Sequence, residues 1–127
     1  MIELKLAVAF HPKALQIYGG GEGIIDRGAL ESALHRPFSL FDGIDLYPTA
    51  IHKAAAIMES LLINQPFIDG NKRIGFMLMM FILRTNRLDL TITENEKYAF
   101  TIKVAEGKMN IDQKTECLKI HVTELNS

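Results

Sequence analysis

One short segment of the sequence has the residue types and spacing of a phosphate-binding loop. The segment Pro66–Arg73 reads PFIDGNKR and passes from a loop directly into the start of a predicted helix. The first main-chain amides of a helix have no partners within the helix and lie at the positive end of its dipole. Such a helix end binds phosphate groups readily, and Gly70 allows the main chain to approach a ligand closely. The segment therefore predicts an anion-binding site.

The charged residues of this segment support the same prediction. Lys72 and Arg73 place two cations in the first helical turn, where the helix dipole disfavours positive charge unless an anion is bound. Asp69 could cap the helix or hold a Mg2+ ion that bridges phosphates. Phe67 is expected to be buried and to fix the loop between two helices. The alternative is a capped helix with two solvated basic residues, and the short spacing alone does not separate the two interpretations.

The elements around the segment are predicted to be mainly helices, because apolar residues recur at helical spacing between clear stop signals. The apolar run Ile74 to Leu83 predicts a helix that is buried on all sides. Residues 37–47 differ, because aromatic and polar residues alternate around Asp42-Gly43 and so predict a short hairpin. The predicted helices are about Glu3 to Tyr18 (stopped by Gly19-Gly20-Gly21), Asp26 to Leu34, Pro48 to Ile63, Asn71 to Thr85, Thr93 to Gly107 with a Thr93/Glu96 capping box, and Asp112 to Glu124.

Length and composition limit the class of protein. The 127 residues, 48% of them apolar, fit one all-α domain over residues 1–127. The single cysteine, Cys117, cannot form an internal disulfide, which favours a cytoplasmic location. The longest apolar run is shorter than the roughly 18 residues of a membrane span. A net charge of −1 without a basic patch predicts no nucleic-acid partner.

The segment around the predicted anion site resembles the loop of the Fic/Doc family. That loop has the form His-Pro-Phe-x-Asp/Glu-Gly-Asn-Gly/Lys-Arg, and residues 65–73 match it everywhere except at Gln65. The resemblance implies a single-domain helical bundle, the Fic fold, with a small flap hairpin. Further matches to the Doc (death-on-curing) toxin branch are Gly19-Gly20, Asp26, Leu30–Leu34, Arg36-Pro37, Asp45–Pro48, Lys53–Ala55 and Ala105–Gly107.

The resemblance also implies a chemistry for the loop. Family members transfer part of a nucleoside triphosphate to a hydroxyl group of another protein, and the Doc branch resembles a kinase that uses ATP. By this resemblance Asp69 would hold Mg2+, the main chain at Gly70 and Asn71 would form the anion hole, and Lys72 and Arg73 would grip phosphates. Lys72 replaces the glycine that is usual in nucleotidyl-transferring members, which favours phosphoryl transfer. Nucleotidyl transfer (AMPylation) remains the alternative enzyme interpretation.

Gln65 is the one departure from the family loop. The family's histidine at this position takes the proton of the attacking hydroxyl, and glutamine has no group that titrates in that range. A positioned general base contributes ~10²–10⁴-fold, so we expect an inactive or weak enzyme, or a pseudoenzyme that binds nucleotide or a partner. Loss of activity in a natural chain and deliberate substitution both account for Gln65, and the otherwise intact loop favours substitution. None of the other histidines is expected to replace the base: His11, His35, His52 and His121.

The resemblance further implies partners. The flap at residues 37–47 would clamp a target segment beside the loop. The alternative is an ordinary surface hairpin whose Phe38, Phe41 and Tyr47 fill the core, and the two interpretations are compatible. The inhibitory pattern Ser/Thr-x-x-x-Glu-Gly/Asn found in many family members is absent, because Thr101 lies one position too far from Glu106. Restraint by a separate antitoxin is therefore implied, as for a toxin of a toxin–antitoxin pair that acts on a target protein such as a translation factor.

Overall fold

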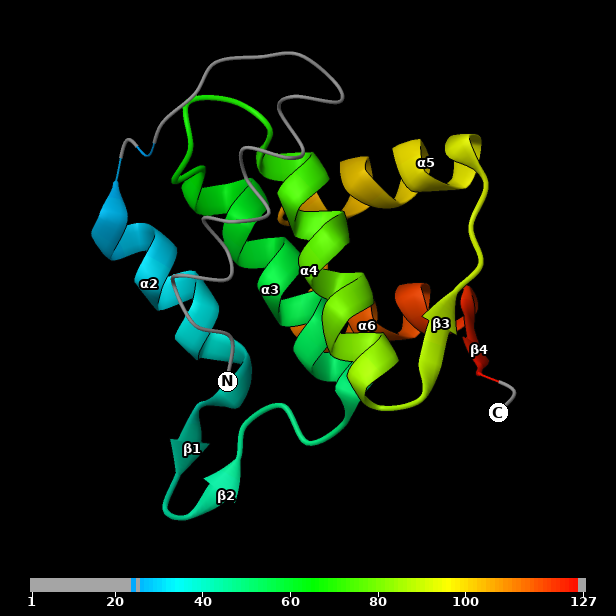
Figure 1. The fold of residues 1–127 in the computed structure, drawn as a ribbon, viewed down its shortest axis with the longest axis horizontal. Helices are drawn as coiled ribbons and strands as arrows, with labels where there is room; N and C mark the ends of the chain where they lie inside the picture. Colours follow the sequence, from blue (N-terminus) through cyan, green and yellow to red (C-terminus); the bar gives the residue numbers. More distant parts are fainter. Residues whose placement is uncertain (1–23, 25, 126–127) are drawn as a thin grey trace.

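The computed structural model describes Ile24 and residues 26–125, and this part of the chain is mostly helical (Figure 1). The predicted helix from Glu3 to Tyr18 and its glycine stop lie outside the described residues. None of the described helices has both the length and the apolar character needed to cross a membrane. The elements are α2 (Arg27–His35), the 3-10 helix η1 (Arg36–Phe38), β1 (Leu40–Phe41), β2 (Ile44–Asp45), α3 (Ala50–Asn64), α4 (Asn71–Thr85), β3 (Leu88–Leu90), α5 (Glu94–Ala105), α6 (Ile111–Lys119) and β4 (Val122–Glu124).

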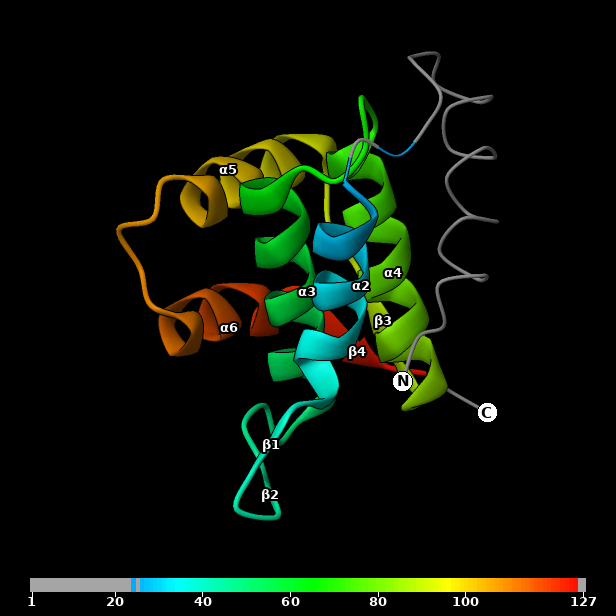
Figure 2. The same ribbon diagram turned by 90° about the vertical axis from the view of Figure 1, so that its left-hand side faces the viewer.

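Helix α3 is the centre of the fold. It runs beside α4 and also contacts α2, α5 and α6 (Figures 1 and 2). Residues Ala54 to Met58 are all buried, because α3 is covered on every side. Gly75 of α4 packs so tightly that a Cβ atom at this position would overlap Met58 Sδ. The apolar run from Ile74 to Leu83 has no exposed residue, which confirms the predicted buried helix.

Helices α2 and α5 begin at the capping residues that the sequence predicts. Asp26 Oδ1 accepts a hydrogen bond from Ala29 N at 2.9 Å and caps α2. The predicted capping box of α5 is present, with Thr93 and Glu96 each bonding the other's main-chain amide. Side-chain capping satisfies amides that would otherwise lack partners in the first turn, so these starts are fixed by a few neighbouring residues.

The hairpin is confirmed, but its aromatic residues do not all enter the core. Phe41 pairs with Ile44 across a two-residue turn in which Asp42 (φ 55°) and Gly43 (φ 80°) are left-handed, as hairpin turns of this length require. Phe41 is 73% exposed, so the interpretation that it fills the core is wrong. Phe38 does pack against the core.

The predicted last helix is wrong beyond residue 119. Helix α6 ends at Lys119, the chain turns, and β4 pairs antiparallel with β3. The residues after the turn include Val122 and Thr123, whose β-branched side chains favour strands. The helix prediction failed because the partner strand, β3, is distant in the sequence and carries only the short pattern Leu-Asp-Leu.

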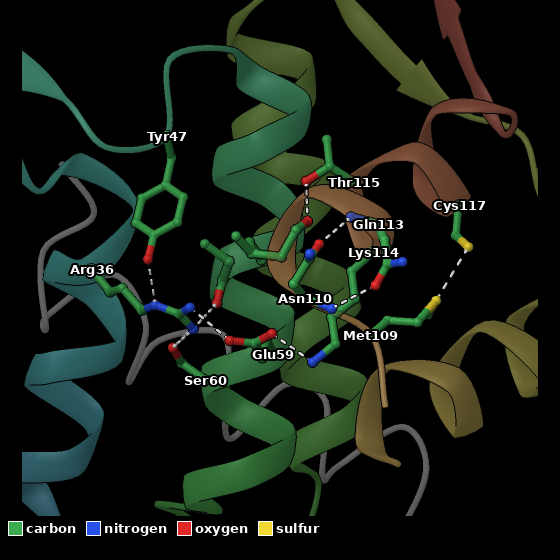
Figure 3. Close-up of polar contacts among 12 residues, drawn as sticks. Arg36, Tyr47, Glu59, Ser60, Met109, Asn110, Gln113, Lys114, Thr115 and Cys117 are labelled. Atoms are coloured by element: carbon green, nitrogen blue, oxygen red, sulfur yellow. Dashed lines mark hydrogen bonds and ion pairs between the residues drawn. The ribbon is translucent and has the colours of Figure 1, made fainter. Parts of the chain in front are cut away.

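An ionic network joins η1, α3 and α6 through Glu59 (Figure 3). Its Oε1 lies 2.6 Å from Arg36 Nη2, and its Oε2 accepts a hydrogen bond from Lys114 Nζ at 2.5 Å. The Lys114 side chain is only 3% exposed. Burial alone would raise the pKa of Glu59, but the hydrogen bonds from Lys114 and Arg36 outweigh burial and lower this pKa. The carboxylate is therefore held ionised between two cations.

Candidate phosphate-binding site

The loop between α3 and α4 begins at Gln65 in a strained main-chain conformation. Gln65 caps the end of α3 with φ 44° and ψ 62°, in the left-handed region. Its amide donates to Leu61 O at 3.1 Å, and its exposed side chain makes one long hydrogen bond, from Nε2 to Leu62 O at 3.4 Å. A left-handed residue other than glycine costs about 1–2 kcal/mol. The chain thus keeps a side chain at this position at the expense of stability.

Phe67 and Asn71 close the loop on itself. The amide of Phe67 donates to Asn71 Oδ1 at 3.0 Å, and the carbonyl of Phe67 accepts from Asn71 Nδ2 at 3.0 Å. The Phe67 side chain is 1% exposed, which confirms its predicted burial. From the other side, Ile24 forms an antiparallel bridge with Phe67, and the amide of Asp26 donates to Pro66 O at 3.2 Å. The loop is therefore fixed on both sides.

Helix α4 begins without a side-chain cap. Its N-cap is Gly70, with φ 84°, and no side chain bonds the first-turn amides. Asp69 Oδ1 instead accepts from the amide of Gly70 at 2.7 Å, so the suggestion that Asp69 caps the helix is wrong. The Asn71 side chain is occupied by Phe67, which leaves only its main-chain amide for a ligand. Among the described residues, the amides of Asn71 and Lys72 have no hydrogen-bond partner. This end can accept an anion.

The charged residues of the loop gather at this helix start because they are adjacent in the sequence. Lys72 is exposed, Arg73 is half-buried, and both lie in the first turn of α4. Asp69 is exposed, and its second oxygen, Oδ2, makes no hydrogen bond or ion pair with any described residue. One carboxylate oxygen beside a phosphate site fits Mg2+, which commonly binds one or two carboxylates together with substrate phosphates.

The hairpin does not lie beside this loop. It precedes α3 and the loop follows α3, so the two occupy opposite ends of that helix in both views (Figures 1 and 2). The expected clamp formed by residues 37–47 beside the loop is therefore wrong. Ile24 and Asp26 contact the loop instead, a neighbourhood that sequence spacing did not indicate.

The histidines within the described part of the chain hold other positions. His52 lies in the first turn of α3, at the far end from Gln65, where Nδ1 is 2.6 Å from Thr49 Oγ1 and Nε2 is 3.5 Å from Asp112. His121 lies in the turn between α6 and β4, and not in a last helix as predicted. His35 ends α2, and His11 lies outside the described residues.

Comparison with known proteins identifies the same family as the sequence of the loop does. The model of the Fic/DOC family matches residues 2–83, about two thirds of the chain. The chain belongs to the Fic/Doc family. Toxin Doc of Mycolicibacterium smegmatis (strain ATCC 700084 / mc(2)155) is 33% identical to this Fic/Doc chain over 100 residues, which cover 79% of this chain and 72% of the relative. The match includes α2, α3, the loop and most of α4.

Proposed function

We propose that this Fic/Doc chain is a cytoplasmic toxin of a toxin–antitoxin pair. Its scaffold is that of a kinase that transfers the γ-phosphoryl group of ATP to a hydroxyl of a target protein, such as a translation factor. The observation that carries the proposal is the uncapped start of α4 next to Gly70, with Asp69, Lys72 and Arg73 around it. Family membership and the similarity to a protein named Toxin Doc support the toxin role.

The residues of the loop suit phosphoryl transfer. The first-turn amides of α4 would bind phosphate oxygens, and the side chains of Lys72 and Arg73 would neutralise their charge. Asp69 would hold Mg2+, which supplies further charge neutralisation when bound. Positioning and charge neutralisation provide most of the catalysis in such reactions. Lys72, a long cation close to the helix end, favours the kinase over nucleotidyl transfer.

Gln65 limits the activity of this copy. The acceptor oxygen bonds to the γ-phosphorus while the bond to the leaving ADP breaks, and the hydroxyl proton must leave. Gln65 can orient the hydroxyl by hydrogen bonding but cannot take its proton. The missing base would cost ~10²–10⁴-fold in rate, which is roughly 3–5 kcal/mol of barrier. The fixed loop remains formed around Phe67 and Asn71, so binding of nucleotide should persist.

The test compares this chain with its Gln65→His variant in bacterial lysate with γ-labelled ATP. Label on a lysate protein only with Gln65→His is expected, and the doubly substituted Gln65→His/Asp69→Asn chain serves as the matched control that should lose it. Labelling of a lysate protein from α-labelled ATP, and not from γ-labelled ATP, would instead identify the chain as a nucleotidyltransferase. Nucleotide binding without any transfer by Gln65→His would point to a pseudoenzyme.

A growth experiment tests the toxin role separately. Expression of the Gln65→His variant alone should arrest bacterial growth, and expression of its antitoxin should restore growth. A harmless Gln65→His variant that is folded and soluble in the cells would refute the toxin proposal.

A further inference from the structure

A cavity of about 550 Å³ lies between α2 and α3, outside the loop described above. Its volume is in the range of sites for small molecules, roughly 300–1,000 Å³. The lining is predominantly polar, in contrast to the apolar packing between α3 and α4. The polar residues that line it include Glu31, Ser32, His35, Arg36, Ser39 and Ser60.

Arg36 is held rigidly at this cavity (Figure 3). Its Nε donates to Tyr47 Oη at 2.9 Å, and its Nη1 donates to Ser60 Oγ at 2.9 Å and to Ala56 O at 3.3 Å. Its Nη2 pairs with Glu59. One of the five N–H groups of the guanidinium therefore has no partner among the described residues. A pre-oriented guanidinium with a remaining donor is a suitable anion ligand.

The charge of the ionic network is not balanced by its own members. Arg36 and Lys114 carry two positive charges, and Glu59, which both contact, carries one negative charge. The network thus has a surplus of one positive charge, and the Lys114 ammonium is buried. Glu31 also lines the cavity, but it is exposed, so that solvent screens its charge.

Ser60 provides a second donor in the cavity wall. The residue is 4% exposed, and its hydroxyl oxygen already accepts the hydrogen bond from Arg36. Its own proton has no acceptor among the described residues. A buried hydroxyl proton without an acceptor costs free energy, which a ligand oxygen would remove. Arg36 and Ser60 together offer two hydrogen-bond donors to an oxyanion.

We infer that this cavity is a second anion site, for a small ligand whose carboxylate or phosphate group is bound by Arg36 and Ser60. The inference does not depend on the proposed toxin function, because it rests on the donors and charges of η1 and α3. His35 lines the same cavity and is therefore a spectroscopic reporter of occupancy.

The test records histidine Cε1–H signals of the full chain by NMR during titration with inorganic phosphate and, separately, with acetate, at constant pH and ionic strength. The chain has four histidines, and the His35→Asn variant assigns the reporter signal. A saturable shift of the His35 signal is expected with at least one anion. The anion that binds more tightly shows whether the ligand carries a phosphate or a carboxylate group. Ser60→Ala should weaken this binding about tenfold.

Lys72→Ala is the matched control, since it alters the loop at the start of α4 and leaves the cavity intact. It should leave the His35 titration unchanged. No saturable His35 shift with either anion would overturn the inference, as would a shift that Lys72→Ala abolishes. Should Ser60→Ala fail to fold, the titration of the unsubstituted chain and of Lys72→Ala still decides the question.

Discussion

Substitution of Glu59 by glutamine should be among the most destabilising polar changes in this chain. Glu59 is the only carboxylate that contacts the Lys114 ammonium within the described residues, and the Lys114 side chain is 3% exposed. Glu59→Gln preserves the shape of the side chain and removes its charge. The substitution therefore leaves a buried ammonium without a counter-ion, and Arg36 also loses its ion pair.

The magnitude follows from the burial of the pair. Breaking a buried ion pair by removing one partner costs about 3–5 kcal/mol. The Glu59 side chain is 13% exposed and glutamine can still accept one hydrogen bond, so we expect the lower end, about 3 kcal/mol. The total free energy of unfolding of such a domain is about 5–15 kcal/mol. In a thermal scan this loss corresponds to a fall in Tm of about 10 °C.

Urea unfolding at neutral pH, followed by circular dichroism, measures the loss. Glu116→Gln is the matched control, because Glu116 is an exposed glutamate on α6 and its substitution should change the free energy of unfolding by less than about 0.5 kcal/mol. The Glu59→Gln/Lys114→Met double variant should be more stable than Glu59→Gln alone, because it removes the stranded ammonium.

The pH dependence gives an independent check. The pKa of Glu59 is lower in the folded than in the unfolded chain, so its contribution to stability is present above the unfolded pKa of about 4.3 and is lost as the pH falls through the lower folded pKa. The stability difference between Glu59→Gln and the unsubstituted chain should shrink accordingly below about pH 4. A difference of less than 1 kcal/mol at neutral pH, or one that grows on acidification, would refute the reasoning.

Three further substitutions test the loop and the central helix pair by urea unfolding. Gln65→Gly should stabilise the chain by about 1 kcal/mol, because φ at this position is 44°, whereas Gln65→His should change stability little. Asn71→Ala should cost about 1–3 kcal/mol and speed hydrogen exchange at the Phe67 amide, since two hydrogen bonds are lost; unchanged exchange would contradict the proposed loop closure. Gly75→Val should cost about 2 kcal/mol through overlap with Met58, and a neutral effect would mean that the helices separate freely.

Features that depend on neighbouring residues were predictable from the sequence. The capped start of α2 at Asp26, the capping box of α5 and the Asp42-Gly43 hairpin turn all use local chemistry, and the structure contains each of them. The loop at residues 65–73 was predicted for the same reason, because a glycine and the first turn of a helix define its geometry within a few residues.

Features that depend on distant residues were not predicted. The pairing of β3 with β4 joins three-residue strands more than 30 positions apart, and no local signal in the sequence indicates that these two segments pair. The contact of Glu59 with Lys114 spans 55 positions. The separation of the hairpin from the loop could have been predicted from helix geometry. Helix α3 has 15 residues, so its two ends lie about 22 Å apart. A hairpin with two-residue strands is too short to reach back over that distance to the loop.

The distance in sequence between Glu59 and Lys114 has a consequence for synthesis of the protein. Ribosomes add about 5–20 residues per second, so the 55 positions from Glu59 to Lys114 take about 3–11 seconds to translate. In the later part of that interval, once residue 85 has been added, the nascent chain contains α3 and α4 with the complete loop between them, while the apolar surface that α6 will cover is still bare. The loop and the residues that contact it, Ile24 and Asp26, are thus made before α6. A chaperone that holds the nascent chain would meet α3 with its future α6 surface exposed.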